Sequence, residues 1–159
     1  MQQRIDYMKS GRGVYEAMIA IEKYLRQSGL DLRLRHLINV RTSQINGCAY
    51  CIDMHWKDAR ADGESEQRLY GLDAWQESPY YTDRERAVLA WTEAVTNIRD
   101  GHTPDEVFEG LKKYFNEKEI ADLTLAVAEI NAWNRLAIAA RATPGVYQPA
   151  RPQELKKGA

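Results

Sequence analysis

The sequence predicts an all-α protein with a single domain of about seven helices. Three observations predict this class: apolar residues recur at helical spacing, sequences typical of helix N-termini precede several segments, and alternating strand patterns are absent. A chain of 159 residues has the size of one domain, and its hydrophobic fraction of 44% is enough to build a core without disulfide bonds.

The first half of the chain contains four of the expected helices. The first carries an apolar face made of Val14, Met18, Ile21 and Tyr24. It ends at Gly29, and a second helix covers residues 32–45. A third covers about residues 48–61, and a short fourth begins at Ser65.

The three later helices begin at sequences that favour an N-terminus. Residues 82–85 (TDRE) and 103–106 (TPDE) are predicted capping boxes, and Pro104 is expected at the first helical position. Asn116 precedes a long helix that reaches about Ala140. From Pro144 the chain has three prolines and a charged end. We therefore predict a helical domain over residues 1–143 and an extended tail over residues 144–159.

Composition and charge exclude several classes of function. A formal net charge of -1 gives no electrostatic footprint for binding nucleic acid or an anionic membrane. No apolar segment is long enough to span a bilayer, and the first ten residues lack the apolar run of a secretory leader. We therefore expect a soluble cytoplasmic protein with no nucleic-acid or membrane partner. In that compartment a C-x-x-C pair is more often catalytic or metal-binding than structural.

The candidate site lies in residues 43–60, SQINGCAYCIDMHWKDAR, which include both cysteines of the chain, Cys48 and Cys51, and His55. At about 100° per residue, these three positions share a helical arc of about 60°. Cysteines three residues apart on a helix are close enough to form a disulfide. A helix N-terminus stabilises a thiolate, and His55 could carry its proton. The pattern therefore indicates a dithiol redox centre.

Two other interpretations of this segment stay open. The cysteines and the histidine could pack as core residues, or Cys48, Cys51 and His55 could ligate zinc with His36 as the fourth ligand. Against zinc, the sequence has no second C-x-x-C or H-x-x-H, and three ligands on one helix leave little loop to shape a tetrahedron. Flavin, haem and nucleotide motifs are absent, so we expect neither a cofactor nor a bound metal.

The segment SQINGCAYCIDMH resembles the signature of the AhpD-like proteins, the alkylhydroperoxidase branch of the carboxymuconolactone decarboxylase superfamily. The similarity extends to MQQRIDYMK at the start, DARADGESEQRLYGLDAWQESP after the motif, and LTLAVAEINAWNRLAIAAR near the end. The resemblance implies an AhpD-like helical fold that assembles into homotrimers or homohexamers. It also implies a hydroperoxide substrate and a dithiol reductant, such as a lipoyl-bearing or thioredoxin-like protein.

The resemblance also implies a role for each residue of the motif. Cys51 would react with the peroxide, Cys48 would be its disulfide partner, and His55 would belong to the proton relay. We therefore expect a cytosolic thiol peroxidase or disulfide reductase. The alternative is a zinc-binding or redox-sensing oligomeric protein with little peroxidase activity.

One position departs from the family pattern. Members of the family usually carry a glutamate twelve residues before the first cysteine, where this chain has His36. Because a histidine cannot supply the same negative charge, we expect the pKa of His55 to lie near or below the usual value of about 6.5. The protein would then be a slow peroxidase. His36 itself could pass a proton through water, ligate a metal or lie on the helix surface.

Overall fold

The computed structural model describes residues 2–149, and over that range the chain forms helices and no strand. The elements are α1 (Tyr7–Ser10), α2 (Arg12–Gln27), α3 (Leu32–Asn46), α4 (Ala49–Ala61), α5 (Glu66–Tyr70), the 3-10 helix η1 (Gly71–Ala74), α6 (Asp83–Thr96), α7 (Asp105–Lys112) and α8 (Glu117–Ala140). The predicted all-α class is confirmed. The expected helices correspond to α2 through α8, and the short elements α1 and η1 are additions.

Two of the three predicted helix caps are confirmed. Thr82 begins α6 and Asn116 begins α8, each with the reciprocal hydrogen bonds of a capping box. The capping box predicted over residues 103–106 is wrong. Pro104 has an extended ψ of 142°, so it is the N-cap residue rather than the first helical residue, and α7 begins at Asp105 without a side-chain cap.

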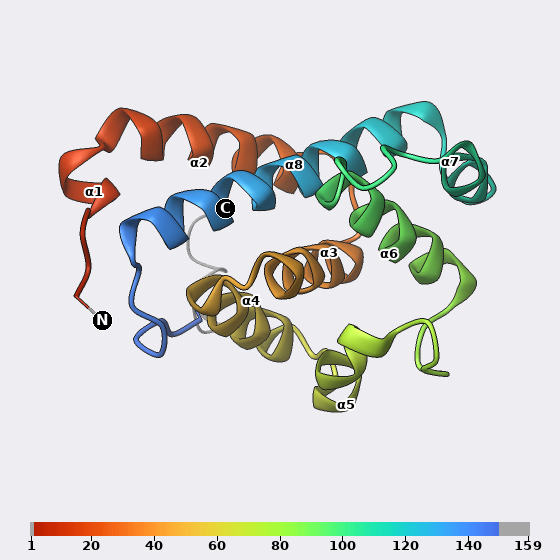
Figure 1. The fold of residues 1–159 in the computed structure, drawn as a ribbon, viewed down its shortest axis with the longest axis horizontal. Helices are drawn as coiled ribbons and strands as arrows, with labels where there is room; N and C mark the ends of the chain where they lie inside the picture. The colour runs from red at the N-terminus through yellow and green to blue at the C-terminus, as the bar shows by residue number, and fades with distance from the viewer. Residues whose placement is uncertain (1, 150–159) are drawn as a thin grey trace.

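Helix α3 lies in the middle of the bundle, between α8 and α4, and also packs against α6 (Figure 1). Its residues Leu34 and Ile38 belong to a core shared with α2, α6, α7 and α8. On another face, Leu37 and Val40 belong to a second core shared with α4, α5, η1 and α6. A helix in this position is buried on nearly every side, so its polar residues are also taken away from water.

The buried polar residues of α3 are Arg35, His36, Asn39, Thr42 and Ser43. Buried polar groups need hydrogen-bond partners, and those partners come from the helices that surround α3. The buried polar residues of α3 therefore mark the part of the bundle in which a functional site is most plausible on chemical grounds.

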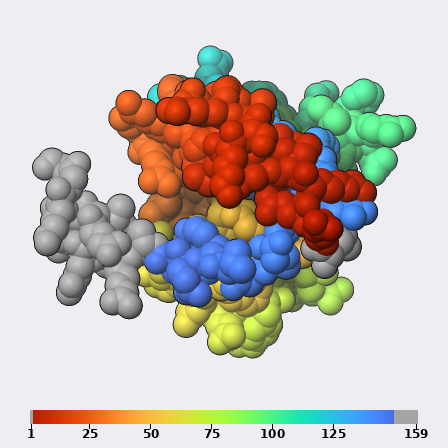
Figure 2. Space-filling model, turned by 90° about the vertical axis from the view of Figure 1, so that its left-hand side faces the viewer, coloured from red at the N-terminus to blue at the C-terminus, as the bar shows by residue number. Residues whose placement is uncertain are grey.

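The chain after α8 returns to α4 in the same molecule. Residues 144–149 form no helix and lie over the outer side of α4 (Figure 2). Lys57 Nζ donates to the carbonyl of Tyr147 at 3.0 Å, and the Tyr147 hydroxyl donates to Asp58 at 2.6 Å. The rest of the predicted tail, residues 150–159, lies outside the described residues. The predicted homo-oligomer stays a prediction.

Candidate functional site

Cys48 and Cys51 are joined by a disulfide where α3 turns into α4. Gly47 ends α3 with a φ of 66°, a left-handed conformation that glycine adopts without strain. Cys48 is the N-cap residue of α4, and its Sγ accepts a hydrogen bond from the backbone N–H of Cys51 at 3.4 Å. Both residues are buried, with exposed fractions of 1% and 2%. The helix start predicted for this pair is therefore present.

The turn that carries the cysteines is anchored to α8 by side-chain amides, of which Asn134 is fully buried. Asn46 Nδ2 donates to Asn131 Oδ1 at 3.0 Å and to Asn134 Oδ1 at 2.8 Å. Asn134 Nδ2 in turn donates to Ser43 Oγ at 3.1 Å. The backbone N–H of Cys48 donates to the carbonyl of Ser43, so the position of Cys48 depends on this network.

His55 lies one helical turn after Cys51 on α4. Asn39 Nδ2 is 3.5 Å from His55 Nδ1, and His55 Nε2 is buried without a hydrogen-bond partner among the described residues. Burial, and then the positive charge of His36, lower the pKa of His55 to about 4. The imidazole is therefore neutral at neutral pH, in the direction expected from the missing carboxylate.

The structure does not join His55 directly to a sulfur. Among the hydrogen bonds of residues 2–149, none links His55 to Cys48 or Cys51. A neutral imidazole can accept a thiol proton, but its low pKa makes it a weak base. His55 is therefore a neutral, weakly basic group one turn after Cys51, and its basicity depends on the charges around it.

His36 is a buried residue, so the interpretation of this position as a helix-surface residue is wrong. Its exposed fraction is 6%, because α3 is covered on nearly every side. His36 Nε2 lies 2.9 Å from Asp62 Oδ2, at the C-terminal end of α4. The zinc arrangement is not formed in the part of the chain that the structure describes, where no three histidine, cysteine, aspartate or glutamate residues could together hold a metal ion.

A second group of charged residues lies in the same polar region and was not predicted from the sequence. Glu22 from α2 accepts from Arg35 Nη2 at 2.7 Å, and Glu129 from α8 accepts from Trp133 Nε1 at 3.0 Å. Burial, and then the negative charge of Glu22, raise the pKa of Glu129 to about 7. The signal in the sequence was an acidic residue inside the apolar run AVAEI.

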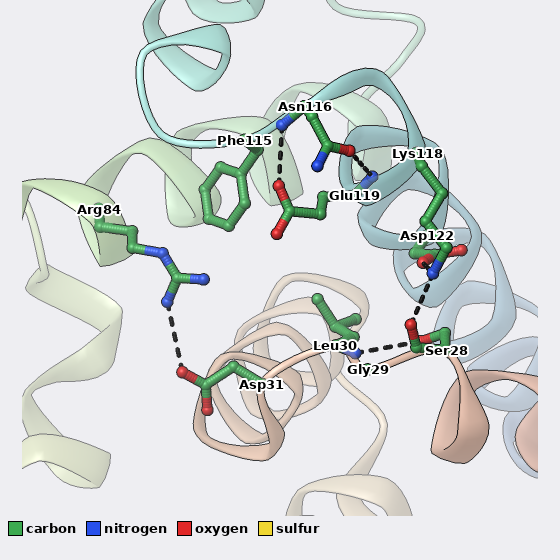
Figure 3. A pocket seen from close by; sticks show the side chains of 10 residues that line it. All are labelled: Ser28, Gly29, Leu30, Asp31, Arg84, Phe115, Asn116, Lys118, Glu119 and Asp122. Atoms are coloured by element: carbon green, nitrogen blue, oxygen red, sulfur yellow. Dashed lines mark hydrogen bonds and ion pairs between the residues drawn. The ribbon is translucent and has the colours of Figure 1, made fainter.

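A pocket at another place in the fold has no comparable chemistry. It lies between the α2–α3 connection, α6 and the start of α8 (Figure 3). Arg84 pairs with Asp31 at 3.3 Å, and Lys118 pairs with Asp122 at 2.7 Å. The remaining charged side chain, Glu119, completes the cap of α8. Since each charged group in this pocket has a partner, the cysteine region is the better candidate site.

The cysteine region lies within a stretch of the chain that is similar to known proteins. The model of the Carboxymuconolactone decarboxylase family matches residues 12–94, a segment that contains the cysteine pair, His36 and His55. The uncharacterized protein YdfG of Bacillus subtilis is 42% identical over 139 residues, which cover 87% of this chain and 95% of that protein.

Two solved structures have the same fold. A protein of unknown function from Agrobacterium tumefaciens, suggested by its name to be the antioxidant defence protein AhpD, is 45% identical, with a TM-score of 0.89. The match covers 92% of this chain and 100% of that one. The debrominase Bmp8 has a TM-score of 0.76 at 21% identity, over 87% of this chain and 75% of its own. At that identity the likeness shows the fold alone.

Proposed function

The chain belongs to the carboxymuconolactone decarboxylase family as an AhpD-like member, and from that membership we propose a thiol-dependent peroxidase that reduces hydroperoxides through Cys48 and Cys51. The observation that carries the proposal is the buried disulfide at the start of α4, beside a neutral histidine. This is the arrangement that a dithiol centre has after it has reduced its substrate.

The first half of the proposed cycle oxidises Cys51. His55, neutral at neutral pH, accepts the proton of the Cys51 thiol. The thiolate attacks the distal oxygen of the hydroperoxide, the O–O bond breaks, and the leaving oxygen takes up a proton and departs as an alcohol. Cys51 is left as a sulfenic acid.

The second half closes the disulfide. The Cys48 thiolate attacks the sulfur of the Cys51 sulfenic acid, an S–S bond forms, and the hydroxyl group leaves as water. The N–H of Cys51 and the positive end of α4 stabilise negative charge on the Cys48 sulfur. Cys48 is therefore suited both to resolve the sulfenic acid and to leave when a reductant attacks Cys51. We propose that a lipoyl-bearing or thioredoxin-like dithiol returns both cysteines to thiols.

The roles of the two cysteines can be tested with a reagent that labels sulfenic acids. After one equivalent of peroxide, Cys48→Ser should be labelled at Cys51, because the resolving thiol is gone. Cys51→Ser should stay unlabelled at Cys48, and wild type should show a disulfide within one chain by mass spectrometry. Labelling of Cys48 in Cys51→Ser would reverse the two roles, and thiols that stay free in oxidised wild type would exclude the cycle.

A further inference from the structure

Four helices bring charged groups together behind the redox centre. Glu22 comes from α2, Arg35 from α3, His55 from α4 and Glu129 from α8. Each Glu22 oxygen accepts a hydrogen bond at 2.7 Å, one from Arg26 Nε and the other from Arg35 Nη2. Two arginines around one carboxylate keep it ionised. Although burial alone would raise the pKa of Glu22, these arginines lower it below its usual value.

Glu129 is the uncharged member of a carboxyl pair. Its exposed fraction is 4%, and burial and then the negative charge of Glu22 raise its pKa. Two nearby carboxyl groups avoid being ionised together, and the two arginines assign the negative charge to Glu22. The pKa of Glu129 is raised to about 7, first by burial, so Glu129 gains or loses a proton near neutral pH.

Helix α3 connects this pair to His55. Arg35 and Asn39 are one helical turn apart, so they share a face of α3. Arg35 binds Glu22, and Asn39 lies 3.5 Å from His55 Nδ1.

Two buried nitrogen atoms of this region lack a hydrogen-bond partner. Arg35 Nε is an N–H donor without an acceptor among the described residues, and His55 Nε2 is a ring nitrogen without a partner there. Unpaired buried donors are costly and leave a positive potential that a nearby anion offsets. Among the charges that face His55, those of His36 and Arg35 lower its pKa, and that of Glu22 raises it.

We propose that the Glu22–Glu129 pair acts as the carboxylate that sets the basicity of His55, in a site whose α3 offers a histidine, His36, rather than an anion. The proposal rests on the peroxidase function above. When Glu129 loses its proton, the pair changes from one negative charge to two, and His55 becomes a better acceptor for the Cys51 proton. The pair thus tunes the basicity of His55 through its charge, without contacting the substrate.

The test compares two buried carboxylates of α8. Glu129→Gln removes the titrating group and keeps the acceptor for Trp133, whereas Asp122→Asn removes a buried carboxylate that is bound to Lys118 and Tyr24. In wild type, imidazole NMR signals of His55 should report a transition near the pKa of about 7 of Glu129, separate from protonation of the ring itself. Glu129→Gln should lose that transition, and Asp122→Asn should keep it.

The same variants should differ in the rate of Cys51 oxidation by one equivalent of peroxide. At pH above that of the Glu129 transition, Glu129→Gln should be slower by about 10-fold, a part of the roughly 10²–10⁴ that general acid–base catalysis contributes. Asp122→Asn should react as wild type does. An unchanged rate and NMR titration in Glu129→Gln, or equal losses in Asp122→Asn, would overturn the proposal.

A second variant covers the case in which Glu129→Gln does not fold. Glu22→Gln removes the like charge beside Glu129 and releases Arg35, so Glu129 should ionise at lower pH and the His55 transition should move with it. A transition that stays in place contradicts the coupling. If wild type ignores peroxide while the NMR transition responds to both variants as described, the peroxidase function is wrong and the coupling between the pair and His55 stands.

Discussion

Replacing His55 by glutamine makes the protein more resistant to acid between about pH 6.5 and pH 4. In the folded protein, burial lowers the pKa of His55 to about 4, whereas an unfolded histidine has a pKa of about 6.5. Between these values the unfolded chain binds a proton that the folded chain does not. The contribution of His55 to the free energy of unfolding is therefore complete above pH 6.5 and is lost as the pH falls toward about 4. At about 1.4 kcal/mol per pKa unit, the loss reaches about 3 kcal/mol, and glutamine removes it.

The measurement is the free energy of urea unfolding at a series of pH values. Glu129 contributes the opposite slope: its pKa is raised to about 7, so its protonation stabilises the folded state as the pH falls from about 7 toward the unfolded value. The comparison is therefore between variants, with the exposed His102→Gln as the matched control. Equal acid slopes in His55→Gln and His102→Gln would contradict the neutral, buried state of His55.

Replacing Asn134 by alanine lowers the free energy of unfolding by about 2–4 kcal/mol. Asn134 is fully buried, and its loss leaves the Ser43 hydroxyl without the donor that reaches it from α8. It also removes one of the two acceptors of Asn46. The cost combines an unsatisfied buried hydroxyl with a small cavity between α3 and α8.

Denaturant unfolding at one pH checks this value. Asn97→Ala is the control, since it makes the same chemical change at an exposed position after α6 and should cost no more than about 0.5 kcal/mol. Equal midpoints for the two variants would show that the amide network does not hold the turn of Cys48.

The sequence predicted those parts of the site that depend on one helix. Cys48 and Cys51 lie at the start of α4, and His55 lies one turn after Cys51, because their spacing and the preceding Gly47 determine where that helix begins. Thr82 begins α6 for an equally local reason. Such features need no knowledge of the neighbouring helices.

The parts that could not be predicted depend on several helices at once. The segment RLRHLINVR has the charges of a half-exposed helix, yet α3 is buried among its neighbours, and Arg35 is paired there with Glu22 at 2.7 Å. Because α3 is buried, His36 also lies inside the bundle rather than on the surface, and it contacts Asp62. The effect of Glu22 on the pKa of Glu129 requires α2 and α8 to lie side by side, which periodicity within either helix does not reveal.

Consumption of an organic hydroperoxide with reduced lipoamide as the electron donor tests the central claim most directly. Wild type should consume one hydroperoxide for each dithiol oxidised, over many turnovers, because Cys48 and Cys51 return to thiols after each cycle. Cys51→Ser should fall to the uncatalysed rate. Turnover by Cys51→Ser at the wild-type rate, or no turnover by reduced wild type, would contradict a peroxidase that works through this cysteine pair.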